Sequence, residues 1–167
     1  MRRRECLGHV GGAAVAWLGL LFFIDAGTSL AAEDSEKRTW RLDADQTRLE
    51  YGTDNPEDTP IAFHCKAGSG RVGVWINETG KGVKPNRTMT ASLTAGRTTS
   101  KVPGKTLPNE EAGTPSFEGT LPANDPLFST LSKERSLVFV VGPSREQVPL
   151  EELGDKADRF SRRCQKK

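Results

Sequence analysis

The sequence predicts a mainly β fold: a small antiparallel sandwich or partly open barrel with a C-terminal helix tied on by a disulfide. Between residues 40 and 121, short runs alternate apolar and polar residues, as half-buried strands do, and turn-forming Gly, Pro and Asn separate them. From residue 150 onward the apolar residues recur instead at spacings of three and four, which is typical of an amphipathic helix. Strands followed by one helix indicate a single β-rich domain.

The N-terminus has the pattern of a secretory signal peptide. Arg2, Arg3 and Arg4 precede an apolar run over 10–24, and Ser29 and Ala31 supply the small residues of a cleavage site after Ala31. The run is short for a membrane span, which needs about 20 residues. We therefore expect a signal peptide over 1–31, an exported domain over 32–167, a secreted or periplasmic location and no stable membrane span after cleavage. The pattern does not decide between Sec and twin-arginine export, or whether the signal peptide is cleaved or retained as an anchor.

Composition excludes some classes of partner. The chain has 24 Lys and Arg against 22 Asp and Glu, a formal net charge of +2, and loss of residues 1–31 brings it closer to neutral. A general nucleic-acid binder would show a clear basic excess, so no nucleic-acid partner is expected. The sequence also shows no His/Cys cluster with metal-ligand spacing and no phosphate-binding Walker loop, so we expect neither a metal nor a cofactor.

The first half of the domain reads as a series of strands joined by turns. Ile61 and Phe63 alternate with Ala62 and His64, and after a Gly-containing turn at 67–70 the alternation resumes, which predicts a β-hairpin. The expected strands of this half are Trp40–Asp43, Arg48–Tyr51, Ile61–Lys66, Arg71–Asn77 and Arg87–Ala95.

The second half is less regular. Three prolines make 96–115 read as long loops with one edge strand at most, and Ser116–Leu121 reads as a further strand. Pro126–Lys133 is expected to form a helical turn or a short helix. The unbroken apolar run Leu137–Val141 predicts a central strand buried on both faces, after which Arg145–Val148 extends or re-enters the sheet.

The C-terminal helix carries one of the two cysteines of the exported chain. Pro149 is placed to open this helix, its acidic residues come early and its basic residues late, as the helix dipole favours, and one apolar stripe runs along it: Leu150, Leu153, Ala157, Phe160 and Cys164. With Cys6 removed in the signal, Cys65 and Cys164 remain. An even count in an exported chain predicts a Cys65–Cys164 disulfide.

Residues 63–74 resemble the signature loop of the cysteine-dependent protein phosphatases, because His64-Cys65 is followed by Arg71 at the family's spacing. The resemblance implies Cys65 as nucleophile, Arg71 as phosphate clamp and a phosphate cradle made by the backbone N–H groups of 66–70. The sequence departs from the family at Val72, where a Ser or Thr is usual, and the alternation over 72–77 leaves no helix after the loop. An exported cysteine phosphatase using Cys65 and Arg71 is therefore the alternative interpretation.

A second resemblance spans most of the domain. The apolar-Cys hairpin over 63–74 and the Phe-x-x-x-Cys helix over 160–164 are similar to small exported bacterial proteins of accessory function, such as the invasion-associated locus B type and components associated with type VI secretion. This resemblance implies a disulfide-stapled β fold outside the cytoplasm and leaves the ligand open.

Candidate binding residues follow from charge and exposure. Arg159, Arg162 and Arg163 concentrate positive charge near the C-terminus, which favours attraction to anionic envelope components and equally suits a solubilising helix end. Trp75 is expected on the outer face of its strand, where it would be a binding handle if exposed; a second covered face explains it equally well. The leading expectation is a non-enzymatic exported domain that binds or assists an envelope component or a partner protein. A structural subunit without a ligand is the third possibility.

Overall fold

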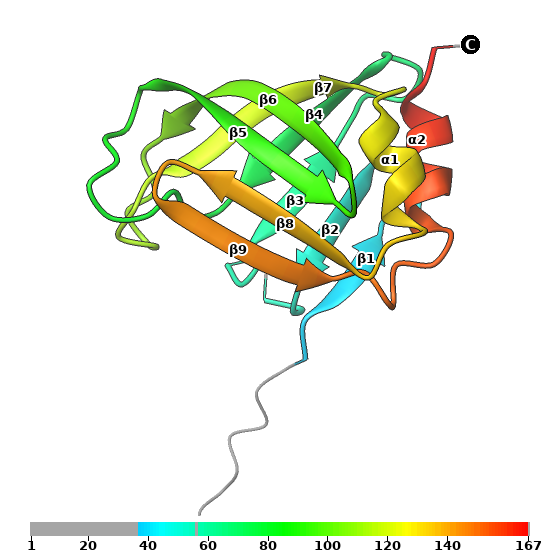
Figure 1. Cartoon of the computed structure of the whole chain (residues 1–167), viewed down its shortest axis with the longest axis horizontal. Coiled ribbons are helices and arrows are strands. Elements are labelled where there is room, and N and C mark those ends of the chain that lie inside the picture. The colour runs from blue at the N-terminus through cyan, green and yellow to red at the C-terminus, as the bar shows by residue number, and fades with distance from the viewer. Residues whose placement is uncertain (1–36, 56, 167) are drawn as a thin grey trace, which may run out of the picture. The chain divides into compact units, whose positions relative to one another are not determined.

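The computed structural model describes residues 37–55 and 57–166 (Figure 1). The described residues all belong to one compact unit. The signal peptide expected over residues 1–31 lies outside the described residues. No helix in the described ranges has both the length and the apolar character needed to cross a bilayer.

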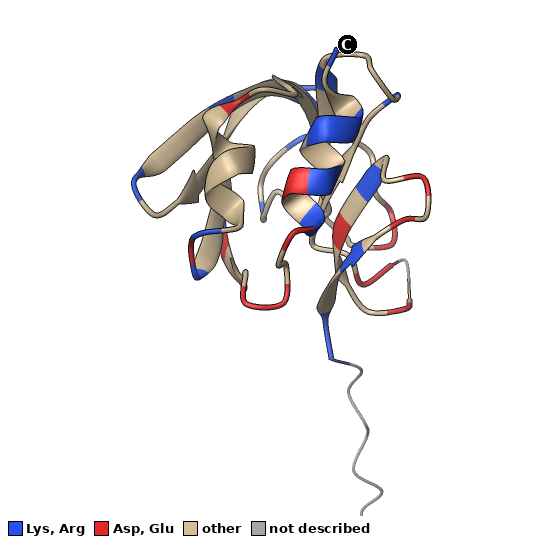
Figure 2. Ribbon diagram, turned by 90° about the vertical axis from the view of Figure 1, so that its right-hand side faces the viewer, with Lys and Arg blue, Asp and Glu red and all other residues tan. Residues whose placement is uncertain are grey.

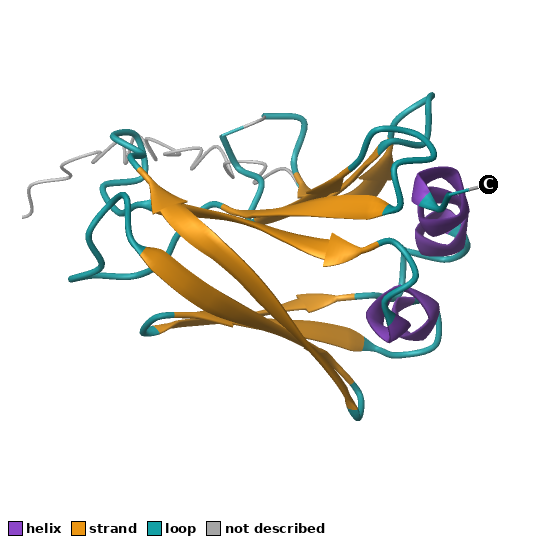
Figure 3. Ribbon diagram, turned by 90° about the horizontal axis from the view of Figure 1, so that it is seen from above, coloured by secondary structure: helices purple, strands orange, loops and turns teal. Residues whose placement is uncertain are grey.

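Within the described residues, nine antiparallel strands form one sheet in the order β1-β2-β3-β4-β7-β6-β5-β8-β9. The strands are β1 (Thr39–Leu42), β2 (Arg48–Gly52), β3 (Ile61–His64), β4 (Arg71–Ile76), β5 (Thr88–Ala95), β6 (Thr98–Leu107), β7 (Ser116–Pro122), β8 (Ser136–Val141) and β9 (Ser144–Pro149). The sheet curls into a half-barrel, so its two halves face each other as layers (Figure 3). This mainly β architecture confirms the predicted fold class.

Two helices lie side by side at one end of the half-barrel (Figures 1 and 3). They are α1 (Pro126–Leu131), capped by the Asp125 side chain at the Leu127 N–H, and α2 (Lys156–Cys164). The loops 43–47 and 65–70 lie at the same end. The opposite end of the half-barrel carries the loops 53–60, 77–87 and 108–115.

The core fills the space between the two layers and under the helices. Phe63 of β3 is fully buried and lies at its centre, with its ring centroid 5.7 Å from that of Phe128 in α1 and 6.5 Å from that of Phe160 in α2. The alternation of the sequence is obeyed in β4, where Val72, Val74 and Ile76 all have no exposed surface. Aromatic packing therefore holds both helices against the sheet.

The two outermost strands, β1 and β9, meet along a seam. Trp40 of β1 donates its indole N–H to the carbonyl of Pro149, at the end of β9, over 2.7 Å. A hollow of about 560 Å³ adjoins this contact, and all of its charged groups except Glu151 pair with one another: Lys37 with Glu152, and Arg38 with Asp58. The Arg38 guanidinium holds the pKa of Asp58 below its usual value. The seam is thus bridged at Trp40, and its charges are largely neutralised.

The structure corrects the expectation of long loops over 96–115. Ten of these residues form β6, the longest strand, which lies between β5 and β7. Pro103 is accommodated because β6 pairs with β7 only from Gly104 onward, so up to Pro103 its second edge has no partner strand. Proline usually indicates a loop, but Pro103 fits into β6 because one edge of the strand has no partner there.

Two further expectations were wrong. β8 is the second strand from an edge, and only Leu137, Phe139 and Val141 are buried, so it is buried on one face rather than both. Pro149 does not open the last helix: it ends β9, and turns over 151–155 precede α2. Gly154 has φ of +52°, a left-handed conformation that cannot belong to a right-handed helix. The whole predicted stripe is nevertheless buried.

Candidate functional site

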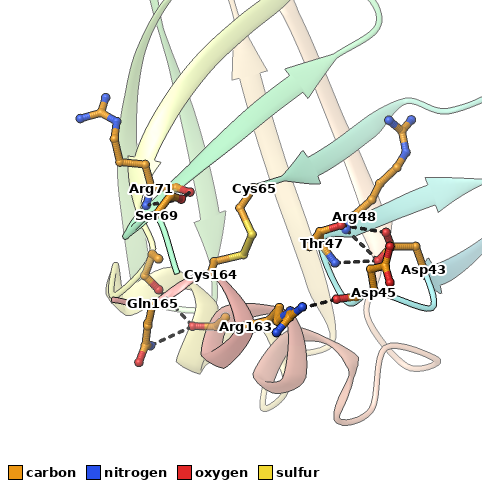
Figure 4. The surroundings of a disulfide bond; sticks show 12 residues. Asp43, Asp45, Thr47, Arg48, Cys65, Ser69, Arg71, Arg163, Cys164 and Gln165 are labelled. Atoms are coloured by element: carbon orange, nitrogen blue, oxygen red, sulfur yellow. Dashed lines mark hydrogen bonds between the residues drawn. A yellow bond between two sulfur atoms is a disulfide. The ribbon is translucent and has the colours of Figure 1, made fainter. Parts of the chain in front are cut away.

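A disulfide joins Cys65, directly after β3, to Cys164, the last residue of α2, with 5.8 Å between their Cα atoms (Figure 4). This is the predicted pairing. Cys164 is fully buried and Cys65 is partly exposed against the same core. The bond fixes the C-terminal end of α2 next to the loop 66–70.

The loop 66–70 caps the end of α2 through its backbone. The Gly68 N–H donates to the Arg163 carbonyl over 2.9 Å, and the Gly70 N–H donates to the Cys164 carbonyl over 2.8 Å. The last carbonyls of a helix lack partners inside it, so these bonds satisfy acceptors that would otherwise need water. Both glycines have positive φ, which lets the loop turn its N–H groups toward the helix. Two N–H groups that the phosphatase interpretation assigns to a phosphate cradle are thus already bonded to protein.

The other groups that a phosphatase would need are also not arranged for catalysis. The Cys65 sulfur is bonded to Cys164, so a thiolate would require reduction of this bond. Arg71 extends away from the disulfide (Figure 4) and donates to the Thr120 hydroxyl on β7 over 2.8 Å. The loop leads into strand β4, not into a helix. His64 lies on the other face of β3, its ring occupying the space above Gly73, where a Cβ would come within 2.2 Å of Nε2.

The disulfide instead gathers cations from separate parts of the chain. We call this group the basic surface; it comprises Lys66 from the loop, Arg71 from β4, Arg162 and Arg163 from the last turn of α2, and Lys166 just beyond it. All five side chains are exposed, and Figure 2 shows the concentration of Lys and Arg toward the C-terminal end of α2. None of the ion pairs formed by the described residues involves any of them.

A hollow of about 490 Å³ lies within the basic surface, between the loop and the end of α2. Arg71 and Lys166 are its charged lining residues, and the Lys166 chain lies against Gly70, where a Cβ would meet its Cγ at 3.0 Å. The other lining side chains include Ser69, Asn124 and Gln165, and no carboxylate belongs to the lining. The arrangement can therefore accept an anion and offers hydrogen-bond donors around it.

The nearest acidic turn, 43–47, does not neutralise these cations through its side chains. The Asp43 carboxylate accepts hydrogen bonds from the Thr47 N–H, the Thr47 hydroxyl and the Arg48 N–H at 2.7–2.9 Å (Figure 4). Burial opposes its ionisation, but these bonds outweigh burial and lower the pKa of Asp43. Arg163 Nε contacts the turn through the backbone carbonyl of Asp45, at 3.2 Å. The turn thus positions Arg163 without a salt bridge.

The remaining predicted binding residues lie elsewhere. Arg159 is half-buried one turn earlier in α2, 3.5 Å from the Asp155 carboxylate, and is less available than Arg162. Trp75 lies near the other end of β4, on its outer face, in a separate hollow of about 660 Å³ that we call the Trp75 cleft. The structure does not bring Trp75 together with the arginines.

Sequence reasoning missed two parts of the basic surface. Lys66 was considered only for its backbone N–H in the phosphate cradle, and Arg71 only as a catalytic clamp, whereas Lys166 belongs to the basic C-terminal stretch that the sequence already showed. Their proximity follows from the disulfide, so the predicted cysteine pairing was the signal that could have placed them beside Arg162 and Arg163.

Comparison with protein-family models, curated proteins and solved structures found no match to this chain. Among the described residues, no group of three or more His, Cys, Asp or Glu is arranged to hold a metal ion.

Proposed function

We propose that this chain is an exported, disulfide-stapled β domain that binds a phosphate-bearing component of the cell envelope through the basic surface, without catalysing a reaction on it. The Cys65–Cys164 bond supports export, because disulfides form and persist in oxidising compartments outside the cytoplasm. The expected signal over residues 1–31 points the same way.

The observation that carries the proposal is the convergence of unpaired cations around a hollow without a carboxylate. A solubilising helix end explains Arg162 and Arg163, since cations near a helix C-terminus complement its dipole. It does not explain why the loop that carries Lys66 is bonded to the end of α2, or why Arg71 lines one hollow with Lys166. A guanidinium and an ammonium at one hollow suit phosphate, which accepts charge-assisted hydrogen bonds from both.

The phosphatase alternative has weaker support. It needs a thiolate at Cys65, a helix N-terminus facing phosphate and an arginine pointing at the sulfur. In the structure the sulfur is cross-linked, the loop N–H groups at Gly68 and Gly70 cap α2, and Arg71 points away. Anion binding uses Arg71 as it stands, with no rearrangement.

Vesicle co-sedimentation tests the proposal. The purified disulfide-bonded chain is mixed with phosphatidylcholine vesicles that contain or lack phosphatidylglycerol, and the bound fraction is measured at low and high salt. We expect binding only to the anionic vesicles and release by salt, because the interaction is electrostatic.

A triple variant, Lys66→Gln/Arg162→Gln/Lys166→Gln, provides the decisive comparison. Each cation near an anionic surface contributes about 1 kcal/mol, so the variant should bind about a hundred-fold more weakly. The matched control removes the same charge at the opposite end, with Lys81→Gln/Lys84→Gln/Arg87→Gln. If both variants lose affinity equally, net charge rather than the basic surface is responsible, and the proposal fails.

Competition identifies the source of the phosphate. Soluble polyphosphate, which carries the same chemistry without a bilayer, is added to chain bound on anionic vesicles. Full release at low concentration favours an envelope polymer such as a teichoic acid, and retention on the vesicles favours the lipid surface. Failure of the wild-type chain to bind either probe would overturn the proposed function.

A further inference from the structure

The Trp75 cleft differs from the basic surface in both charge and position. It lies at the end of β4 where the chain enters the loop 77–87, while Arg71 begins β4 at the helix end. Leu107 and Pro108 form apolar parts of its lining together with Trp75, and its charged lining residues are Glu57, Glu78 and Glu111. No Lys or Arg belongs to the lining.

Trp75 is half-buried at this end of the sheet. Its cross-strand partners are Ala62 on β3 and Glu118 on β7, and part of the indole remains accessible as lining of the cleft. Among the described residues, the indole N–H of Trp75 has no hydrogen-bond acceptor, whereas that of Trp40 donates to Pro149. Core packing and a hydrogen bond therefore explain the position of Trp40, whereas part of the Trp75 side chain remains accessible to a ligand.

The walls of the cleft are held in place by side chains from different loops. Asn109 donates its amide to the Asn77 side-chain oxygen over 2.8 Å, and Asn77 donates to the Glu57 carbonyl over 3.2 Å. These bonds connect the loops 53–60 and 108–115 to the end of β4. A ligand would thus meet a cleft whose shape exists before binding, which reduces the entropy cost of association.

We infer that the Trp75 cleft binds a lysine or arginine side chain presented by a segment of a partner protein. An aromatic face attracts a cation that lies over it, and carboxylates at its rim add attraction of the same sign. None of Glu57, Glu78 and Glu111 takes part in an ion pair among the described residues, so these carboxylates are available to a cation in the cleft. The apolar lining suits the methylene stem of such a side chain.

This inference goes beyond the proposed function and does not rest on it. The two sites lie at opposite ends of the domain and have opposite charge, so a chain that uses both would hold a basic partner segment near an anionic envelope component. Each site can be lost without the other, because the residues that line them do not overlap.

The test uses a short Arg-Gly-Lys-Arg peptide as the probe, with a neutral version in which citrulline and acetyl-lysine replace Arg and Lys. The indole N–H resonance of Trp75, assigned with Trp75→Phe, is followed by NMR while each peptide is titrated into the purified disulfide-bonded chain. We expect the basic peptide to shift this resonance saturably and the neutral peptide to leave it unchanged.

Variants then assign the binding energy. Trp75→Ala should weaken binding of the basic peptide about five- to thirty-fold, and Trp75→Phe should weaken it less, because Phe keeps a ring with a weaker cation–π attraction. Glu111→Gln should weaken binding, while Glu110→Gln should not: Glu110 is its exposed neighbour outside the lining, and both changes remove the same charge.

Three results would overturn the inference: an unmoved Trp75 resonance, equal affinity for the neutral peptide, or equal losses in Glu111→Gln and Glu110→Gln. A fourth result would identify a different ligand for the cleft. If sedimentation shows self-association that both Trp75→Ala and the basic-surface triple variant abolish, the cleft binds the basic surface of a second copy of this chain, not a partner protein.

Discussion

Loss of the Cys65–Cys164 bond should lower the free energy of unfolding by several kcal/mol while the folded structure persists. Two perturbations remove it: reduction of the wild-type chain, which deletes no atoms of the core, and the double variant Cys65→Ala/Cys164→Ala. The fold should survive both, because Phe160 and Ala157 of α2 remain fully buried against the sheet and α1.

The magnitude follows from the length of chain that the bond closes. The cysteines are 99 residues apart, and a cross-link over such a loop restricts the unfolded chain by an entropy worth about 4.7 kcal/mol at 25 °C. The variant should lose somewhat more than the reduced chain, since Cys164 is fully buried and truncation to Ala removes its sulfur from the core.

Urea unfolding followed by circular dichroism measures this difference. Small proteins have denaturant slopes of about 1–3 kcal/mol/M in urea, so the midpoint should fall by about 2 M on reduction. Intact mass before and after reduction verifies the starting state, because the disulfide form is two protons lighter.

Two results would refute the reasoning. A midpoint that moves by less than about 0.5 M would mean that closing this loop does not restrict the unfolded chain as assumed. Two separate transitions in the reduced chain would mean that α2 detaches before the sheet unfolds, and that the disulfide, not the aromatic core, holds the helix in place.

Two further predictions concern the core and the open end of the half-barrel. Phe63→Ala should cost about 3–5 kcal/mol, because the ring is fully buried and contacts Phe160; urea unfolding measures the loss, and a cost below about 1 kcal/mol would contradict the central place of this residue. Glu146→Gln should alter the pH dependence of stability. The pKa of Glu146 is raised above 4.5, mainly by burial and also by the charge of Glu78, while Arg38 has the opposite effect. A raised folded-state pKa means that the stability of the wild-type chain falls as pH rises from about 4.5 through that pKa. The variant lacks this carboxyl group, so its Tm should rise relative to that of the wild type over the same pH range. A difference in Tm that stays constant with pH would rule this out.

Local patterns in the sequence were sufficient for most of the strands. β1, β2, β3, β4, β5 and β7 lie within about two residues of their expected bounds, because short alternating runs separated by turn residues mark them in the sequence. The pattern failed at β6, where Pro103 resembled a loop signal. Whether a proline is tolerated depends on which edge of the strand is paired, and only the register of β6 against β7 decides that.

The candidate sites were less predictable than the strands. The sequence identified Arg162, Arg163 and Trp75, whose charge or position along a strand or helix is visible locally. It did not place Lys66 beside Lys166, because their proximity arises from contacts between segments about a hundred residues apart. It likewise did not place Glu111 near Trp75, since two different loops meet at the cleft.

By itself, the sequence determined that this chain is mainly β, that its last apolar stripe packs inward and that Cys65 pairs with Cys164. These properties follow from the period of hydrophobic residues and from the count of cysteines, which need no knowledge of distant contacts. Only the tertiary structure decided the strand order, the half-barrel with its seam at Trp40, and the two oppositely charged sites. Surface sites depend on which loops and strand ends meet, and that depends on the non-local pairing of strands, which alternation along a single strand does not encode.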